Sequence, residues 1–158
     1  MTMNADQIAA YAEFAERIAA LKRLPRTGWL QRGIAAAESV AEHSFGVAAL
    51  ALAFAAEDTT LDRSRLLAIA IVHDMAEALL GDLPLSARRL LGEDVKRAAE
   101  ARAMAELFPA LPAGAQFVAL WEEYAAGTNR EARLVKALDR VETLAQALAY
   151  ERAGNRGL

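Results

Sequence analysis

The chain has 158 residues and a net charge of −3, with 55% hydrophobic and 25% charged residues, which is typical of one globular domain. It has no cysteine, which excludes disulfides, thiol catalysis and cysteine-based metal sites. The acidic balance argues against a general nucleic-acid binder. The longest apolar run, 47–56, is too short to span a bilayer and the N-terminus lacks a signal-peptide pattern, so we expect a single domain over 1–158 in the cytoplasm, without membrane contact.

The first predicted helix covers Ala5–Leu24, where apolar residues recur at helical spacing, and it ends at Pro25. The turn that follows carries Arg26 and Trp29, with Arg32 close behind. Composition alone favours a buried tryptophan and solvated arginines. Because a guanidinium matches phosphate with a planar pair of donors, Arg26 and Arg32 are also candidate phosphate ligands.

The second predicted helix begins with a capping box, Ser39-Val40-Ala41-Glu42. In this motif the serine hydroxyl and the glutamate carboxylate satisfy free N–H groups at a helix start. The capping box places His43 in the first turn, and residues 45–56 are almost wholly apolar. We therefore expect this helix to be central to the core. A histidine in such a helix is usually a packing residue, unless it has partners that make it a ligand.

The third predicted helix covers Asp62–Leu80 and ends at Gly81. Its apolar surface is interrupted by three polar side chains that the helical spacing places on neighbouring parts of one face: His73, Asp74 and Glu77. Burying such groups without partners is costly. A divalent cation would stabilise them, because imidazole and carboxylate are its common ligands. Asp82 follows in a turn, where capping or solvation is the simpler interpretation.

Three further helical regions are predicted: a short helix and then a longer, charged one after Gly92 within Ser86–Phe108, a helix over Gln116–Ala126, and a last helix from the capping box Thr128-Asn129-Arg130-Glu131 to about Ala153. Trp121 and Tyr124 have the spacing of packing residues. Asp139 lies next to the apolar stripe of the last helix, with Lys136 one turn earlier. No alternating strand pattern occurs, so we predict an all-α fold with five or six main helices.

The polar residues on the most apolar helices together suggest a metal centre with four ligands: His43, His73, Asp74 and Asp139. This donor set would accept one divalent ion of manganese, cobalt, iron, zinc or magnesium, and it leaves coordination positions open for water and substrate. A metal in such a site lowers the pKa of bound water and polarises a phosphoryl oxygen. Glu77 could then orient the water or transfer its proton, and Lys136 is a further cation for phosphate. The alternative is a structural scaffold with buried salt bridges.

The motifs also resemble a known family. Glu42-His43, His73-Asp74 and Asp139, in this order, resemble the H…HD…D signature of HD-domain metal-dependent phosphohydrolases. Five longer segments resemble the small 5′-deoxynucleotidase branch of that family: LKRLPRTGWLQRG, ESVAEHS, LAIAIVHDMAEALLGDLP, WEEY and LVKALD. The resemblance runs from about Leu21 to Glu151, which is most of the chain.

The resemblance implies a helical HD domain that hydrolyses deoxyribonucleoside 5′-monophosphates to deoxynucleoside and phosphate. It implies one divalent metal held by His43, His73, Asp74 and Asp139, with Glu77 as the catalytic carboxylate. It also implies that Arg26 contacts the phosphate, that Trp29 packs near the sugar and disfavours a 2′-hydroxyl, and that Asp82 binds or positions the sugar. Members of this branch are commonly homodimers.

Two features depart from the family pattern. Thr27-Gly28 separates Arg26 from Trp29, whereas these two residues are adjacent in some bacterial relatives. The chain also ends soon after Arg152, where many relatives continue, so we expect a more open pocket or dimer edge. The alternatives are a hydrolase of another nucleotide, such as a triphosphate or a cyclic or alarmone phosphodiester, and a non-catalytic binder of metal and nucleotide. The presence of Glu77 argues against the binder.

Overall fold

The structure is a computed structural model that describes residues 3–108 and 111–158. Within these ranges the regular structure is helical, with one isolated bridge between Pro25 and Ser39 and no strand. Six helices have ten or more residues: α1 (Ala5–Ile18), α3 (Val40–Glu57), α4 (Arg63–Val72), α7 (Glu93–Leu107), α8 (Gly114–Ala126) and α9 (Arg130–Arg152). The shorter elements are the 3₁₀ helix η1 (Ala19–Lys22), α2 (Thr27–Leu30), α5 (Glu77–Leu80) and α6 (Leu85–Leu91). The predicted all-α fold is therefore confirmed.

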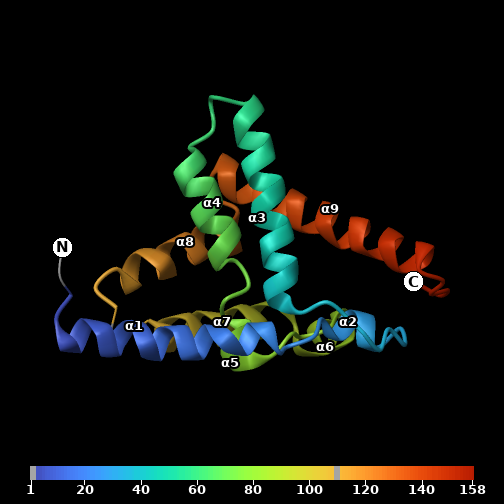
Figure 1. Cartoon of the computed structure of the whole chain (residues 1–158), viewed down its shortest axis with the longest axis horizontal. Coiled ribbons are helices and arrows are strands. Elements are labelled where there is room, and N and C mark those ends of the chain that lie inside the picture. The colour runs from blue at the N-terminus through green and yellow to red at the C-terminus, as the bar shows by residue number, and fades with distance from the viewer. Residues whose placement is uncertain (1–2, 109–110) are drawn as a thin grey trace.

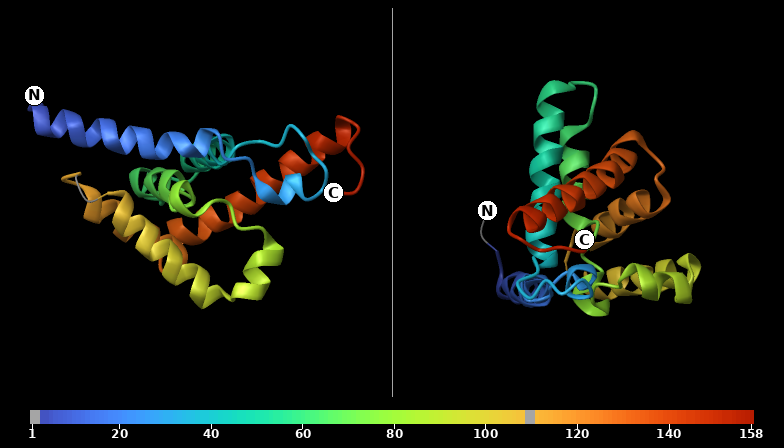
Figure 2. Two further views of the ribbon diagram at one scale, coloured as in Figure 1. Left: turned by 90° about the horizontal axis from the view of Figure 1, so that it is seen from below. Right: turned by 90° about the vertical axis from the view of Figure 1, so that its right-hand side faces the viewer.

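The helices form two groups (Figure 1). Helices α3 and α4 stand side by side, and α9 packs against both of them. Helices α1, α2, α5, α6 and α7 lie along the lower edge of the same view. The two views of Figure 2 show the same arrangement, with α9 running as one long helix toward the C-terminus. One buried cluster joins α3, α4 and α9, and a second joins the end of α4 to α7 and α8.

Helix α3 is the central helix, as predicted. The Ser39 hydroxyl accepts the backbone N–H of Glu42, and the Glu42 carboxylate accepts the N–H of Ser39 at 2.6 Å, so the capping box is present. The residues that this helix buries recur every three to four positions: Val40, His43, Val47, Ala51 and Ala55. Among the described helices, α3 alone has the length and composition to cross a membrane. Its buried stripe packs against α4 and α9.

The prediction of one continuous third helix over Asp62–Leu80 is wrong. Helix α4 ends at Val72, and α5 begins only at Glu77. Between them the chain makes tight turns, in which Met75 N–H donates to Val72 O and Glu77 N–H donates to Asp74 O, both at 3.1 Å. A run of such turns keeps nearly the same apolar spacing as an α-helix, so periodicity did not reveal the break. The break places His73 and Asp74 at the end of α4 rather than within a helix.

Two other predicted boundaries also differ. The first predicted helix continues beyond α1 only as the 3₁₀ helix η1. The last helix is capped by Asn129, whose side chain accepts the N–H of Ala132 at 2.8 Å, and not by Thr128. Glu131 accepts the N–H of Asp62 at 3.0 Å instead of closing a capping box. The carboxylate is thus used between helices, a choice that a local motif does not reveal.

Candidate metal centre and active site

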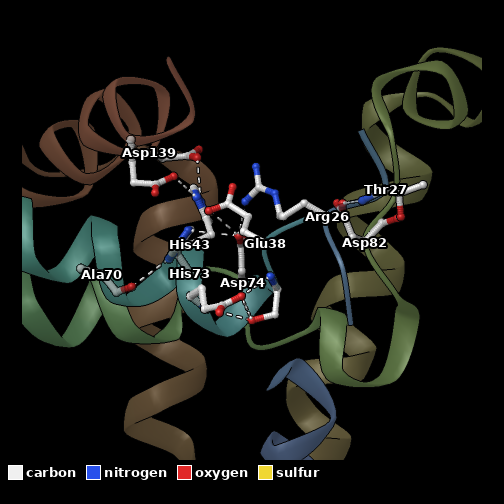
Figure 3. A network of polar contacts seen from close by, with 12 residues as sticks. Arg26, Thr27, Glu38, His43, Ala70, His73, Asp74, Asp82 and Asp139 are labelled. Carbon is white, nitrogen blue, oxygen red and sulfur yellow. Dashed lines mark hydrogen bonds and ion pairs between the residues drawn. The ribbon is translucent and has the colours of Figure 1, made fainter. Parts of the chain in front are cut away.

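The structure brings the four predicted metal ligands together from three segments (Figure 3). His43 comes from α3, His73 and Asp74 from the end of α4, and Asp139 from α9. One ligand atom from each of His43, His73 and Asp139 lies within 4.8 Å of the others. Asp74 Oδ2 lies 3.2 Å from His73 Nε2 and 3.7 Å from His43 Nε2. Residues up to 96 positions apart in the chain, 43 and 139, thus share one site.

The two buried imidazoles are oriented as a metal site requires. His43 Nδ1 contacts Glu142 Oε2 at 2.5 Å, and His73 Nδ1 contacts the backbone oxygen of Ala70 at 2.8 Å. The Nε2 atoms of both rings are buried and make no hydrogen bond. A buried nitrogen without a partner is costly. Because these two atoms face carboxylates, a divalent cation fits the donor set and would satisfy both nitrogens.

The electrostatics of the cluster point the same way. Burial lowers the pKa of His43, but the carboxylates of Asp139 and Glu142 outweigh burial and raise it to about 9. Burial also lowers the pKa of His73, and the Asp74 carboxylate more than reverses this effect. Burial raises the pKa of Asp74, but the two imidazoles and Arg26 depress it well below its usual range. The carboxylates therefore favour positive charge at this point, which a metal ion can supply in place of protons.

Glu77 lines a cavity that His73, Asp74 and Asp139 also line. Its Oε2 is buried and without a hydrogen-bond partner. Burial, together with the negative charges of Asp74 and Asp82, raises the pKa of this carboxyl to about 10. A carboxyl group that holds a proton at neutral pH beside a metal centre is suited to proton transfer.

The cavity has a volume of about 900 Å³, within the usual range for a small-ligand site. Arg26, Asp82 and Lys136 line it, along with Glu77 and three of the four candidate ligands: His73, Asp74 and Asp139. The Arg26 guanidinium lies 3.5 Å from Asp74 Oδ2. Burial lowers the pKa of Arg26, but the surrounding carboxylates more than compensate, so the group is a permanent cation at the metal centre. Lys136 Nζ donates to the Ala125 backbone oxygen at 3.0 Å.

Asp82 is tied to the turn that carries Arg26. Its Oδ2 accepts the backbone N–H of Thr27 at 2.5 Å, and its backbone oxygen accepts the Thr27 hydroxyl at 2.9 Å. Asp82 thus joins the start of α2 to the segment after α5. This contact holds Arg26 at the cavity, and it corresponds to the capping interpretation of the sequence.

Two of the predicted substrate residues are not among the described residues that line the cavity: Trp29 and Arg32. Trp29 is only 8% exposed, donates its Nε1–H to Glu38 at 2.9 Å and packs edge-on against Tyr150. Arg32 is exposed and donates to the backbone oxygen of Gly28 at 3.4 Å. Trp29 thus follows the core interpretation, because the short α2 turns its indole toward α9. Direct contacts of these two residues with substrate find no support in this geometry.

Sequence reasoning missed two residues of the site. Tyr124, assigned to packing, donates its hydroxyl to Asp139 Oδ2 at 3.3 Å and packs edge-on against the His73 ring. Glu142 was not singled out, although it contacts His43 directly. Its position three residues after Asp139 was the available signal, because residues at this spacing share one face of a helix.

Comparison with known proteins shows the same family. A family model described as "HD domain" matches residues 18–157. The chain is 36% identical to 5′-deoxynucleotidase HDDC2 of Bos taurus, covering 98% of this chain and 75% of that protein. It is 34% identical to 5′-deoxynucleotidase hdd1 of Schizosaccharomyces pombe, covering 97% of this chain and 78% of that protein.

Solved structures agree with the sequence matches. A conserved hypothetical protein from Pyrococcus furiosus has a TM-score of 0.82 and 37% identity, over 92% of this chain and 82% of that one. A predicted metal-dependent phosphohydrolase from Magnetospirillum magnetotacticum has a TM-score of 0.72 and 32% identity, over 89% and 71% of the two chains. The chain therefore belongs to the HD-domain family, and it is similar over most of its length to members that are named 5′-deoxynucleotidases.

Proposed function

We propose that this protein is a metal-dependent 5′-deoxynucleotidase that hydrolyses deoxyribonucleoside 5′-monophosphates to deoxynucleoside and phosphate. The observation that carries the proposal is the convergence of His43, His73, Asp74 and Asp139, whose two imidazole Nε2 atoms make no hydrogen bond, beside Glu77 at the wall of one cavity. The similarity to proteins named 5′-deoxynucleotidases supports the choice of substrate.

The chain's own residues would divide the chemistry among them. The four ligands would hold one divalent ion, which when bound supplies positive charge that polarises the phosphoryl group and lowers the pKa of water. Arg26 would bind phosphate oxygens from the cavity wall beside Asp74. Glu77, protonated at the start, would give its proton to the 5′ oxygen as the P–O bond breaks, and the carboxylate left behind would take a proton from the attacking water. The water oxygen thus ends in phosphate, and the nucleoside leaves with a free hydroxyl.

The identity of the metal is also a proposal. Two imidazoles and two carboxylates form a donor set of intermediate hardness, which suits manganese and cobalt and also accepts iron, zinc or magnesium. We propose highest activity with manganese or cobalt. The test is to strip the metal, reconstitute the protein with each ion and measure phosphate and nucleoside released from deoxy- and ribonucleoside monophosphates. Release from the deoxy substrates is expected, and a lack of release with every ion would contradict the proposal.

A hydrolase of another nucleotide is the second candidate. The observation in its favour is that several further cations line the same cavity: Arg88, Lys96, Arg97 and Arg140. These side chains could face a longer phosphate chain. The same assay therefore includes a deoxynucleoside triphosphate and a cyclic diester. Faster turnover of either one than of the monophosphate would favour this alternative.

We further infer that residues 1–158 act as one HD domain, as a homodimer in the cytoplasm, without nucleic acid or membrane. Support for a dimer comes from large apolar side chains left exposed on two helices that pack together: Phe45 and Leu52 of α3, and Val141, Leu144 and Leu148 of α9. Phe45 is 76% exposed, and exposed apolar surface often marks an interface. Light scattering should give twice the 17.0 kDa chain mass, and Phe45→Asp should shift it to one chain.

A further inference from the structure

The His43 ring lies between two carboxylates from one turn of α9. Its Nε2 is 3.2 Å from Asp139 Oδ1, and its Nδ1 is 2.5 Å from Glu142 Oε2. Asp139 and Glu142 are three residues apart, so a single helical turn presents both groups. The carboxylate on the Nε2 side belongs to the proposed metal centre. The carboxylate on the Nδ1 side takes no part in the proposed hydrolysis.

We propose that Glu142 is a positioning residue of the metal centre, which accepts the Nδ1–H of His43 and so keeps the ring's Nε2 lone pair free for a divalent cation. The inference rests on the proposed metal-dependent function. A neutral imidazole can carry its proton on either nitrogen, and the hydrogen bond at one nitrogen decides which nitrogen is left to bind metal. An ionised carboxylate can only accept, so it fixes the proton on the nitrogen that it contacts.

The packing around Glu142 is built for this contact. Its side chain is only 12% exposed, and the hydrogen bonds of the described residues give it His43 as partner. A Cβ on Gly46 of α3 would lie 2.8 Å from both Glu142 Cγ and Oε1. A glycine at this position therefore lets the carboxylate enter the gap between α3 and α9. Burying a carboxylate at a helix interface is costly unless it has a specific partner.

The two histidines differ in the strength of this support. His73 Nδ1 contacts a neutral backbone oxygen, that of Ala70, whereas His43 Nδ1 contacts a carboxylate. A carboxylate partner makes the imidazole a stronger donor to metal than a carbonyl partner does, and loss of such a partner typically lowers metal affinity 10- to 100-fold. The effect of Glu142 should therefore be found at His43 and not at His73.

A second cation site is the competing interpretation, because Glu38, His43 and Glu142 also offer ligand atoms within 4.8 Å of one another. The short His43–Glu142 contact uses the imidazole nitrogen that such a site would need, and Trp29 donates to the Glu38 carboxylate. One ion per chain is therefore expected. A measured stoichiometry of two ions, with the second lost in Glu142→Gln, would overturn the positioning role.

The test compares metal affinity in the full-length chain for wild type, Glu142→Gln and Gly46→Ala, with Glu151→Gln as the matched control. Glu151 is an exposed carboxylate on the same helix. Titration of zinc or manganese against a chromophoric chelator should show affinity lowered by about 10- to 100-fold in Glu142→Gln, in the same direction in Gly46→Ala, and unchanged in the control. If Glu142→Gln does not fold, Glu142→Asp and Gly46→Ala carry the comparison.

A spectroscopic measurement separates positioning from general stabilisation. The chain has only two histidines, so long-range ¹H–¹⁵N spectra of the zinc-loaded protein can be assigned to His43 and His73. Glu142→Gln should shift the Nδ1 signal of His43 and leave that of His73 in place. Equal affinities and an unshifted His43 signal would overturn the positioning role alone. A wild-type protein that binds no ion would instead overturn the proposed function.

Discussion

The guanidinium of Arg26 lies 3.5 Å from the carboxylate of Asp74, and both side chains are largely buried at the wall of the cavity. One of these residues precedes α2 and the other follows α4, so tertiary packing brings a candidate phosphate cation to a candidate metal ligand. The contacts between Thr27 and Asp82 fix the turn that carries Arg26. The arrangement places binding of phosphate and of metal next to each other.

Replacing Arg26 by Gln should lower kcat/KM for a deoxynucleoside monophosphate by about 10- to 100-fold, because a charge-assisted hydrogen bond to phosphate contributes roughly 1.5–3 kcal/mol. Metal affinity should not fall, since the substitution removes a positive charge from beside Asp74. Arg23→Gln, at an exposed position next to the same turn, is the control. Weaker metal binding with unchanged KM would contradict a phosphate-binding role.

Glu77→Ala and Asp74→Ala should separate chemistry from metal binding. Glu77→Ala is expected to abolish turnover and keep the metal, because Glu77 is not needed as a ligand. Asp74→Ala should lose both, because Asp74 Oδ2 lies between the two imidazoles. Metal content by elemental analysis and phosphate release are measured on the same samples. Wild-type turnover in Glu77→Ala would show that another group transfers the proton.

The metal-free protein should become less stable as the pH rises above neutrality. The pKa of Glu77 is raised from its ordinary 4.5 to about 10 and that of His43 from 6.5 to about 9, so between these values the folded chain binds more protons than the unfolded chain. The free energy of unfolding then falls with pH, by linkage. Urea unfolding from pH 6 to 9 should show this slope.

Glu77→Gln should reduce that slope, because a neutral amide has no proton to lose. The His43 contribution, between pH 6.5 and 9, should remain in this variant. Saturating metal should also weaken the dependence, since metal binding displaces protons from its ligands. A metal-free stability that rises from pH 6.5 to 9 would contradict a protonated Glu77 and a protonated His43 in the folded chain.

Trp29→Phe should lower stability and leave sugar selectivity unchanged. The substitution keeps a large aromatic ring against Tyr150 but removes the Nε1–H that Glu38 accepts, at an expected cost of about 1 kcal/mol for one hydrogen bond lost to a partly buried acceptor. The measurements are urea unfolding and the ratio of kcat/KM for deoxy- over ribonucleoside monophosphates. A fall in that ratio would restore the role near the sugar that the family resemblance implied.

Local sequence was sufficient for much of the architecture. Apolar spacing and the Ser39 capping box located α3, because both depend on residues within a few positions of each other. The same periodicity predicted one helix across Val72 and Glu77, where the chain in fact turns. An isolated segment does not specify such a break, since its i→i+3 hydrogen bonds differ little from those of a helix end.

Residue types and their spacing were enough to predict the donor set: two histidines and two aspartates on apolar helices, with Glu77 close behind. Burial of these groups without partners is too costly for them to be incidental, however the helices are arranged. The packing of the helices was needed to show which carboxylate faces each nitrogen of His43, and that Trp29 packs against Tyr150 and is not among the described residues that line the cavity. These contacts join residues about 100 positions or more apart, and the packing of α3 and α2 against α9, not local preference, sets their distances.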